Sequence, residues 1–519
     1  MLHLPLEPQQ IQRVKTLARE IAAQVQDFID LHSSDSSERT VLRLYGVDGV
    51  TEDGVPLPNR LVELLRESRL IESGVSRAFA AAMIKTGLGA SETAQALHEG
   101  TIRFSELKSI PADLVINKEK ELCQRAISLL DRSRKVKREK AQKFGNPSYP
   151  WRYLIVASGN IFEDRTQARS AAFSGADVIA VIRSTAQSLL DYIPFGATTE
   201  GFGGTYATQE NFRIMRSALD EVSQDLKRYV RLTNYSSGLC MAEIAACAAI
   251  EDLDMLLNDS MYGILFRDIN MKRTFVDQYF SRMICGRAKI VINTGEDNYL
   301  TTSDAIDKAY TVTASQLINE AMGHNALLSD DLLGLGHAFE INPKIKNQLL
   351  YEVSHAQLAR QLFPSAPLKY MPATKHKSTD IFFSHVMDTL FNLVTIATKQ
   401  GIHLAGMATE AIHTPLMQDR YKSLANTNYV FNAAADFGSE FQIRPDGFIA
   451  KRAQQVLDEA EACLIKVHEV GLMQAISEGQ FADTYRSKDG GKGLSGVFAK
   501  AIDYSNPILA QIKAEGMME

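Results

Sequence analysis

Through the middle of the chain, eight short apolar runs alternate with amphipathic segments of helical length, and this alternation restricts the possible folds more than any other feature. Strand–helix alternation is typical of parallel strands joined by crossover helices. Eight units over about 260 residues match a (β/α)8 TIM-type barrel, for which about 250 residues is typical. An open doubly wound sheet is the alternative, because the third and fourth runs are weak. The runs are Tyr153–Ala157, Val178–Ile182, Val230–Leu232, Leu253–Leu257, Ile290–Ile292, Leu332–Leu335, Leu368–Met371 and Ile402–Ala405.

Helical patterns flank the predicted barrel on both sides. In residues 11–29 apolar side chains recur at three- and four-residue steps, and Phe448–Glu469 is the clearest helix after the barrel. The segment Gly145-Asn-Pro-Ser-Tyr-Pro150 is the clearest linker. We therefore expect an α/β protein with an N-terminal helical extension over residues 1–148, a barrel over 149–415 with its functional site at the C-terminal face, and a C-terminal helical extension over 416–519.

Composition excludes several classes of protein. The chain has 62 acidic and 56 basic residues, a net charge of −6, which argues against a nucleic-acid partner. No apolar run reaches the roughly 18 residues of a membrane-spanning helix, and Met1–Gln10 has no secretory signal pattern. The five cysteines are widely spaced and contain no CxxC pair, so neither a disulfide framework nor a structural zinc site is expected. These features predict a cytoplasmic protein without a membrane partner.

Polar side chains and glycines follow the predicted strands, at the end of a barrel where functional groups gather. Arg183–Ser188 follows the second strand, and Asn293–Asn298 follows the fifth. The loop 196–204 has four glycines in nine residues, which suits a close approach to a ligand or a lid. Hydroxyls, arginine and backbone N–H groups at helix N-termini are the groups that bind phosphate. Each loop taken alone is equally typical of ordinary turns and helix caps.

Several of these stretches are long and distinctive, and they resemble the alpha subunit of lysine 5,6-aminomutase. The resemblance extends over nearly the whole chain, and the related ornithine 4,5-aminomutase shares the barrel plan more loosely. The stretches that carry it are Val181–Tyr192, Gly196–Phe212, Met261–Asn270, Ile292–Leu300 and Pro367–Pro372.

This resemblance implies a radical 1,2-shift of an amino group in D-lysine or L-β-lysine, from C6 to C5. Adenosylcobalamin would supply the 5′-deoxyadenosyl radical, and pyridoxal 5′-phosphate would hold the migrating amine as an imine. The cofactors carry such chemistry, while the protein binds, orients and shields.

The resemblance also assigns roles to individual residues. Tyr262 resembles the aromatic ring that stacks on pyridoxal phosphate, and Asp297 and Lys369 resemble the pair that holds the amine and carboxylate of the substrate. We expect these three to take part in catalysis. A core tyrosine at the rim and a mutual Asp297–Lys369 ion pair are the structural alternatives. The expected coenzyme shell consists of Arg183, Ser188, Ser237, Tyr262, Arg267 and Asn298, with Glu340 and His337 as weaker candidates for the adenosyl ribose or a proton relay.

The cobalt-binding motif Asp-x-His-x-x-Gly is missing from this chain. His403-x-x-Gly406 and His468-x-x-Gly471 have Gly401 and Lys466 in the Asp position, and the first strand carries no lysine suited to a Schiff base. The resemblance places both features on a smaller cobalamin-binding beta subunit. We therefore expect that subunit as an obligate partner, in an α2β2 assembly.

Other readings of the sequence lead to different classes of protein. Gly491-x-Gly493-x-x-Gly496 fits a dinucleotide pattern, but no strand precedes it. Seven of the eleven histidines fall between His324 and His413, which makes a metal-dependent hydrolase barrel the alternative enzyme. Such a site needs an early His-x-His pair, which the first strand lacks, so we expect no metal ligands. A barrel that serves only as a scaffold is the third possibility, and the polar strand ends argue against it.

Overall fold

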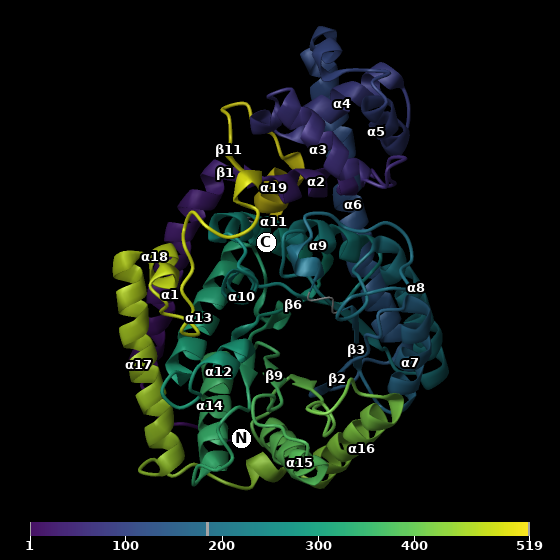
Figure 1. Ribbon diagram of the computed structural model, residues 1–519. Helices are drawn as coiled ribbons and strands as arrows, with labels where there is room; N and C mark the ends of the chain where they lie inside the picture. The colour runs from purple at the N-terminus through teal and green to yellow at the C-terminus, as the bar shows by residue number, and fades with distance from the viewer. Residues whose placement is uncertain (1, 183–185, 517–519) are drawn as a thin grey trace.

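The computed structural model describes residues 2–182 and 186–516, and at its centre is a ring of parallel strands surrounded by helices (Figure 1). The strand order is β7-β6-β5-β4-β3-β2-β10-β9-β8. β7 and β8 are separated only by Leu335, so they form one interrupted strand whose first part pairs with β6 and whose second part pairs with β9. This pairing closes the ring. The strands are β2 (Trp151–Ile155), β3 (Val178–Ile182), β4 (Arg231–Tyr235), β5 (Met255–Leu257), β6 (Val291–Asn293), β7 (Leu333–Gly334), β8 (Gly336–Ala338), β9 (Lys369–Met371) and β10 (Ile402–Leu404).

The predicted barrel is confirmed, and the eight apolar runs correspond to its eight strands. The third run, Val230–Leu232, is short because β4 continues through Thr233 and Asn234, two polar residues that are fully buried. An open doubly wound sheet is excluded by the closure through β7 and β8.

Helices follow the strands and form the outer ring. Side-chain oxygens fix several of their starts: Asn160 accepts from the N–H groups of Phe162 and Glu163, and Asp380 does the same at the start of α15. The helices are α7 (Ile161–Phe173), α8 (Gln209–Leu226), α9 (Met241–Ile250), α10 (Ser260–Arg267), α11 (Met271–Ala288), α12 (Tyr299–Thr302), α13 (Ala309–Asn325), α14 (Gln348–Leu362), α15 (Ile381–Ala397) and α16 (Met417–Ala433).

α16 packs against α7, α15 and β2 and so completes the ring of helices. It begins just after residue 415, where the sequence predicts the end of the barrel. The division of the chain at residues 148 and 415 into separate domains stays a prediction.

The two terminal extensions cover one side of the barrel (Figure 1). α1 (Pro8–Leu31) and α17 (Phe448–Val470) pack against α13, and α2 (Asp35–Leu44) packs against α9. α6 (Ala112–Phe144) and α19 (Pro507–Gly516) both contact α11. β1 (His32–Ser34) pairs antiparallel with β11 (Val497–Ala499), so the two ends of the chain are joined. The remaining helices are α3 (Leu57–Glu67), α4 (Val75–Thr86), α5 (Ala90–His98) and α18 (Leu472–Ser477).

In the part of the chain that the structure describes, no helix combines the length and the apolar composition needed to span a bilayer.

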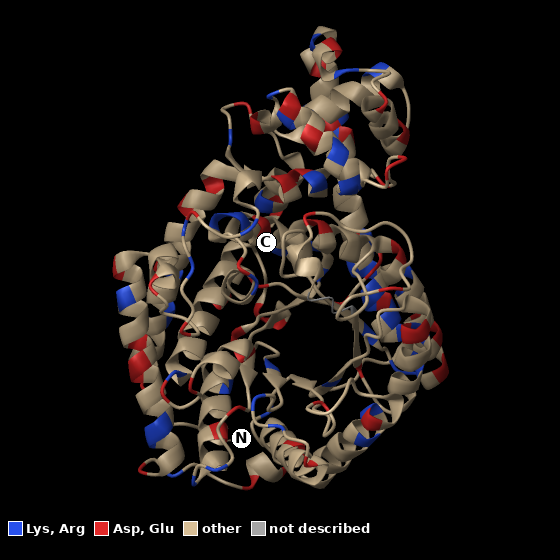
Figure 2. Ribbon diagram, in the orientation of Figure 1, with Lys and Arg blue, Asp and Glu red and all other residues tan. Residues whose placement is uncertain are grey.

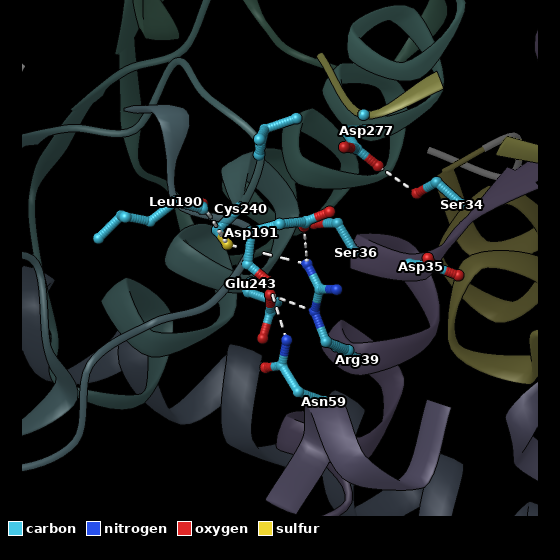
Figure 3. A network of polar contacts seen from close by, with 12 residues as sticks. Ser34, Asp35, Ser36, Arg39, Asn59, Leu190, Asp191, Cys240, Glu243 and Asp277 are labelled. Carbon is cyan, nitrogen blue, oxygen red and sulfur yellow. Dashed lines mark hydrogen bonds and ion pairs between the residues drawn. The ribbon is translucent and has the colours of Figure 1, made fainter. Parts of the chain in front are cut away.

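A buried network of charges fastens α2 to the loop that follows β3 (Figure 3). The Arg39 guanidinium lies 2.7 Å from a Glu243 carboxylate oxygen and 2.5 Å from Asp191. Arg43 contacts the other Glu243 oxygen at 2.8 Å, and Arg273 contacts Asp191 at 2.8 Å. Because Asp191 follows the short turn Gln187–Leu189, the N-terminal extension helps to hold a loop at the C-terminal face of the barrel.

The glycine-rich segment near the C-terminus packs against the same network. Gly493 accepts a hydrogen bond from Arg273 through its carbonyl oxygen, at 3.3 Å. A Cβ atom on Gly496 would lie 2.2 Å from Arg273 Nη1, so a side chain at residue 496 would displace the guanidinium. Close packing against Arg273 therefore accounts for Gly496, while Gly491 and Gly493 have positive φ angles of +80° and +86° and pack against the backbone of residues 268–270 and against Leu239.

Glu243→Gln tests the contribution of this network to stability. The change leaves the buried Arg39 and Arg43 guanidinium groups without their shared carboxylate, and we expect a loss of about 3–5 kcal/mol in the free energy of unfolding. Urea unfolding followed by circular dichroism measures it.

The control is Glu221→Gln, which removes an exposed ion pair with Arg165 and should cost at most about 1 kcal/mol. Equal effects of the two substitutions would contradict a structural role for the network.

Candidate active site

A cavity of about 650 Å³ opens at the C-terminal ends of the strands. Drug-sized ligands and cofactors occupy cavities of about 300–1,000 Å³. Gly201, Gly203 and Gly204 of the predicted glycine-rich loop line one side. Six of the ten residues predicted for the site also line it, namely Ser237, Tyr262, Arg267, Asp297, Asn298 and Lys369. The barrel therefore brings together residues that are up to 132 positions apart in the sequence, from Ser237 to Lys369.

Tyr262 lies on α10, and Arg267 holds its ring in place. Arg267 Nη2 donates to the Tyr262 hydroxyl at 2.6 Å, and the guanidinium carbon lies 5.1 Å from the ring centroid. Behind the ring is Gly295, where a Cβ atom would lie 2.8 Å from Tyr262 Cβ and Cδ2. The absence of a side chain at residue 295 thus permits the tyrosine to pack against the backbone.

Asp297 and Lys369 form a buried ion pair, with 3.3 Å between Lys369 Nζ and Asp297 Oδ2. Burial alone would lower the pKa of Lys369, but the charge and hydrogen bond of Asp297, together with Tyr235 and Tyr262, raise that pKa above its ordinary value. Burial raises the pKa of Asp297, and Lys369 counteracts only part of this shift. Asp297 Oδ1 has no hydrogen-bond partner among the described residues. The mutual pairing left open by the sequence is therefore present, with one carboxylate oxygen still unsatisfied.

Ser237, Asn298 and Ser188 lie around these groups. Ser237 Oγ accepts from the N–H of Asp259 at 2.8 Å, and Asn298 Nδ2 donates to Asp297 Oδ2 at 3.2 Å. Ser188 packs against Gly238, where a Cβ atom would lie 2.6 Å from Ser188 Cα. The serine predicted from the second strand is thus adjacent to the serine predicted from the third. Arg183, the remaining coenzyme candidate, lies outside the described residues.

Glu340 and His337 do not line the cavity. Glu340 Oε1 accepts from Thr374 N–H at 2.7 Å and from the Thr374 hydroxyl at 2.6 Å, so it fastens the loop after β9. His337 is buried, stacks on Tyr370 with ring centroids 4.2 Å apart, and lies 2.9 Å from Gln400 Oε1. Burial lowers the pKa of His337 to about 3. These contacts give both side chains a packing role in the structure, and their predicted roles at the coenzyme stay predictions.

Sequence reasoning missed Lys377, a second buried lysine in the cavity wall. Its ammonium lies 3.0 Å from Asp388 and 2.8 Å from Glu410, and it donates to the Met407 carbonyl at 2.9 Å. Burial would lower the pKa of Lys377, but the two carboxylates raise it, while burial raises the pKa of Asp388 to about 7. Lys377 and Glu410 each lie in a loop that follows a strand, and this position in the sequence could have identified them as candidate site residues.

A metal-dependent hydrolase requires ligands that converge on the cavity. Among the described residues, the His and acidic side chains close enough to share a metal ion are Glu320, His324 and Asp330. None of the three lines the cavity, and Glu320 pairs with Lys15 of α1 on the outside of the barrel.

A closed parallel barrel with a polar cavity at the carboxyl ends of its strands defines a TIM-barrel enzyme subunit. A family model described as "D-Lysine 5,6-aminomutase TIM-barrel domain of alpha subunit" matches residues 4–511. The lysine 5,6-aminomutase alpha subunits of Acetoanaerobium sticklandii and Fusobacterium nucleatum are 50% and 51% identical to this chain, over 96% of each sequence. The chain belongs to the family of lysine 5,6-aminomutase alpha subunits, and it is part of an aminomutase, an isomerase.

A more distant relative is the D-ornithine 4,5-aminomutase subunit beta of Acetoanaerobium sticklandii. It is 24% identical over 370 residues, which are 68% of this chain and 50% of that subunit. The looser resemblance to the ornithine enzyme is thus confirmed.

The buried histidines predict how stability depends on pH. His337, His355 and His403 each have a pKa lowered by burial to about 3, against 6.5 for an exposed histidine. Between these values the unfolded chain binds more protons than the folded one, so stability falls as the pH drops below 6.5. We expect His337→Phe, which keeps a ring on Tyr370, to reduce the loss between pH 7 and pH 5 by about 2 kcal/mol in urea unfolding.

Phe339→Leu serves as the control, because it changes the same apolar cluster without a titrating group. It should lower stability equally at both pH values, and a pH dependence of His337→Phe identical to that of the natural chain would disprove the prediction.

Proposed function

We propose that this chain is the barrel subunit of an adenosylcobalamin- and pyridoxal-phosphate-dependent enzyme that moves an amino group from C6 to C5 of D-lysine or L-β-lysine. The observation that carries the proposal is the juxtaposition, in one cavity, of the Tyr262–Arg267 pair and the buried Asp297–Lys369 ion pair. The two relatives that share half of the sequence are named lysine 5,6-aminomutase alpha subunits, which supports the same reaction here.

The residues of the cavity suit pyridoxal phosphate. The ring of Tyr262 offers an aromatic face, and Ser237 and Arg267 are of the types that bind a phosphate dianion. Ser188, which packs against Gly238, is of the same type. Asn298 would hold the phenolic oxygen. A Cβ atom at Gly238 would meet the Ser188 backbone at 2.6–2.8 Å, so the two serine-bearing loops approach closely only because residue 238 is glycine. When bound, pyridoxal phosphate holds the migrating amine and adenosylcobalamin supplies the radical that starts the migration.

Asp297 and Lys369 suit the two charged ends of an amino acid. In the substrate-free chain each neutralises the other, because an isolated charge at these buried positions would be costly. A bound zwitterion presents an ammonium to Asp297 and a carboxylate to Lys369, and the unsatisfied Asp297 Oδ1 is available as an additional acceptor. Substrate binding would therefore exchange one set of buried ionic contacts for another.

The chain also shields the reaction from water. The cavity is framed by the barrel strands, and Gly201, Gly203 and Gly204 form part of its wall. Gly203 and Gly204 have φ angles of +74° and +134°. Residues other than glycine rarely adopt such backbone angles, so the path of the loop 196–204 requires glycine at these two positions. We assign this loop the role of a cover over the bound substrate.

A partner subunit is needed to complete the site. The lysines that line the cavity are Lys369 and Lys377, and both are held in ion pairs. Neither offers a free amine for a Schiff base, which supports a Schiff-base lysine on a smaller cobalamin-binding beta subunit. The word "alpha" in the names of the relatives also implies such a partner. We propose an α2β2 assembly in the cytoplasm.

Reconstitution tests the function. The purified chain, the beta subunit and both cofactors should convert D-lysine to 2,5-diaminohexanoate or L-β-lysine to 3,5-diaminohexanoate, as measured by mass spectrometry of the products. The chain alone should show no turnover. Conversion of ornithine without conversion of any lysine isomer would overturn the substrate assignment.

Tyr262→Ala tests the stacking role in the same assay. Loss of the ring removes about 0.5–1.5 kcal/mol of stacking beyond area burial, and we expect about two- to tenfold lower turnover with weaker pyridoxal phosphate binding. The thermal midpoint should change little, because the side chain is only half buried.

Tyr262→Phe is the control, since it keeps the ring and loses only the hydroxyl that Arg267 contacts. It should retain most of the cofactor affinity. Turnover of Tyr262→Ala at the rate of the natural chain would refute the role of the ring.

A further inference from the structure

α15 and α16 present an apolar face to solvent. Along this face Phe382 is 79% exposed, Leu416 64%, Tyr421 59% and Tyr429 73%. In Figure 2 the ribbons of α15 and α16 are mostly tan. The charged residues are Asp388 in α15, which is buried against Lys377, and Asp419, Arg420 and Lys422 near the start of α16. We call this surface the α15–α16 face; its exposed apolar residues are Ile381, Phe382, Phe383, Val386, Ile412, Leu416, Met417, Tyr421 and Tyr429.

The area of the α15–α16 face is that of a protein interface. The exposed fractions of its nine residues amount to about five fully exposed side chains, or on the order of 1,000 Å² at about 200 Å² each. The largest apolar patch on a monomeric protein is usually about 300–600 Å². One partner in a standard protein–protein interface contributes about 800 Å². The exposed area of the α15–α16 face is thus larger than the usual apolar patch of a monomeric protein and large enough for one side of a standard interface.

The outer surfaces of other helices in the ring are either covered by the terminal extensions or charged. α9, α11, α13 and α14 are packed against the terminal extensions. The outer surfaces of α7 and α8 are charged and carry ion pairs such as Arg169–Asp225 at 2.9 Å and Arg165–Glu221 at 3.5 Å. The main packing partners of α15 and α16 are neighbouring barrel elements and the short turn Phe437–Ser439. The α15–α16 face is therefore left uncovered by the described residues of this chain, and its two helices hold fewer charged side chains than α7 and α8.

The same face continues to the mouth of the cavity. The loop between β10 and α16 contributes Ala411, His413, Thr414 and Pro415 to the cavity lining. Ile412, within this stretch, and Leu416, directly after it, are exposed and belong to the α15–α16 face. A molecule seated on the face would thus border one wall of the cavity that contains Tyr262 and Lys369.

We propose that the α15–α16 face is the docking surface for the smaller cobalamin-binding subunit. The proposal rests on the proposed function, which requires that subunit to bring a lysine and the cobalamin to the cavity. A partner anchored on this face is held beside the cavity mouth, so its lysine can enter the barrel while its body covers about 1,000 Å² of apolar surface.

The experiment measures the affinity of the full chain for the purified beta subunit by isothermal titration calorimetry. Phe382→Glu and Tyr421→Glu each place a charge in the apolar face, and we expect each to raise the Kd at least tenfold. Phe173→Glu is the matched control, because Phe173 is an exposed aromatic residue on α7 outside the face, and it should leave the Kd within twofold. All three side chains are solvent-exposed, so thermal midpoints should match that of the natural chain.

The outcomes separate this proposal from the proposed function. Unchanged Kd values for Phe382→Glu and Tyr421→Glu, in a complex that still turns over lysine, would overturn the docking surface and leave the function intact. Absence of any binding by the natural chain would instead remove the partner and with it the proposed function. Sedimentation velocity of the chain alone adds a third outcome: dimers that the two substitutions dissolve would assign the face to a second copy and overturn the proposal.

Discussion

Closure of the strand ring at the interrupted strand β7–β8 is the constraint on which the rest of the structure depends. Parallel strands expose unpaired backbone groups at two edges unless the sheet closes. Here the first half of the strand pairs with β6 and the second half with β9. Gly334 and Gly336 flank the interruption, and Cβ atoms there would lie 2.6 Å from Asn293 Oδ1 and from the Thr294 carbonyl. The two glycines allow the strand to change its pairing partner from β6 to β9 between residues 334 and 336.

The same closure sets the geometry of the site. A Cβ atom on Gly336 would also lie 2.8 Å from Asp297 Oδ1, so the carboxylate that pairs with Lys369 rests directly on the strand that closes the barrel. Lys369 N–H in turn donates to the carbonyl of Leu335, the residue at the interruption. The ion pair between Asp297 and Lys369 therefore depends on the same contacts that close the ring. A change in the path of the interrupted strand would move both charged side chains.

Most of the fold and part of the site could be predicted from the sequence, because apolar periodicity reports strands and helices directly. β4 was underestimated because its buried Thr233 and Asn234 give no apolar signal. Tyr262, Asp297 and Lys369 were predicted from a resemblance and the cavity brings them together, but their distances depend on the barrel. Lys377 was missed because its partners Asp388 and Glu410 come from two other segments of the chain. Contacts between distant segments leave no pattern in the local sequence. The contacts of His337 with Gln400 and of Glu340 with Thr374 could not be predicted for the same reason.

The antiparallel pairing of β1 with β11 has a consequence for how the protein is made. It joins residues 32–34 to residues 497–499, so this pairing cannot form until residue 499 has been synthesised. The guanidinium of Arg273 contacts both Asp191 and Gly493. Its contact with Gly493 likewise cannot form until residue 493 has been synthesised. Nascent chains truncated before residue 493 would therefore lack the contact that links the glycine-rich segment Lys488–Gly496 to the charge network at Asp191.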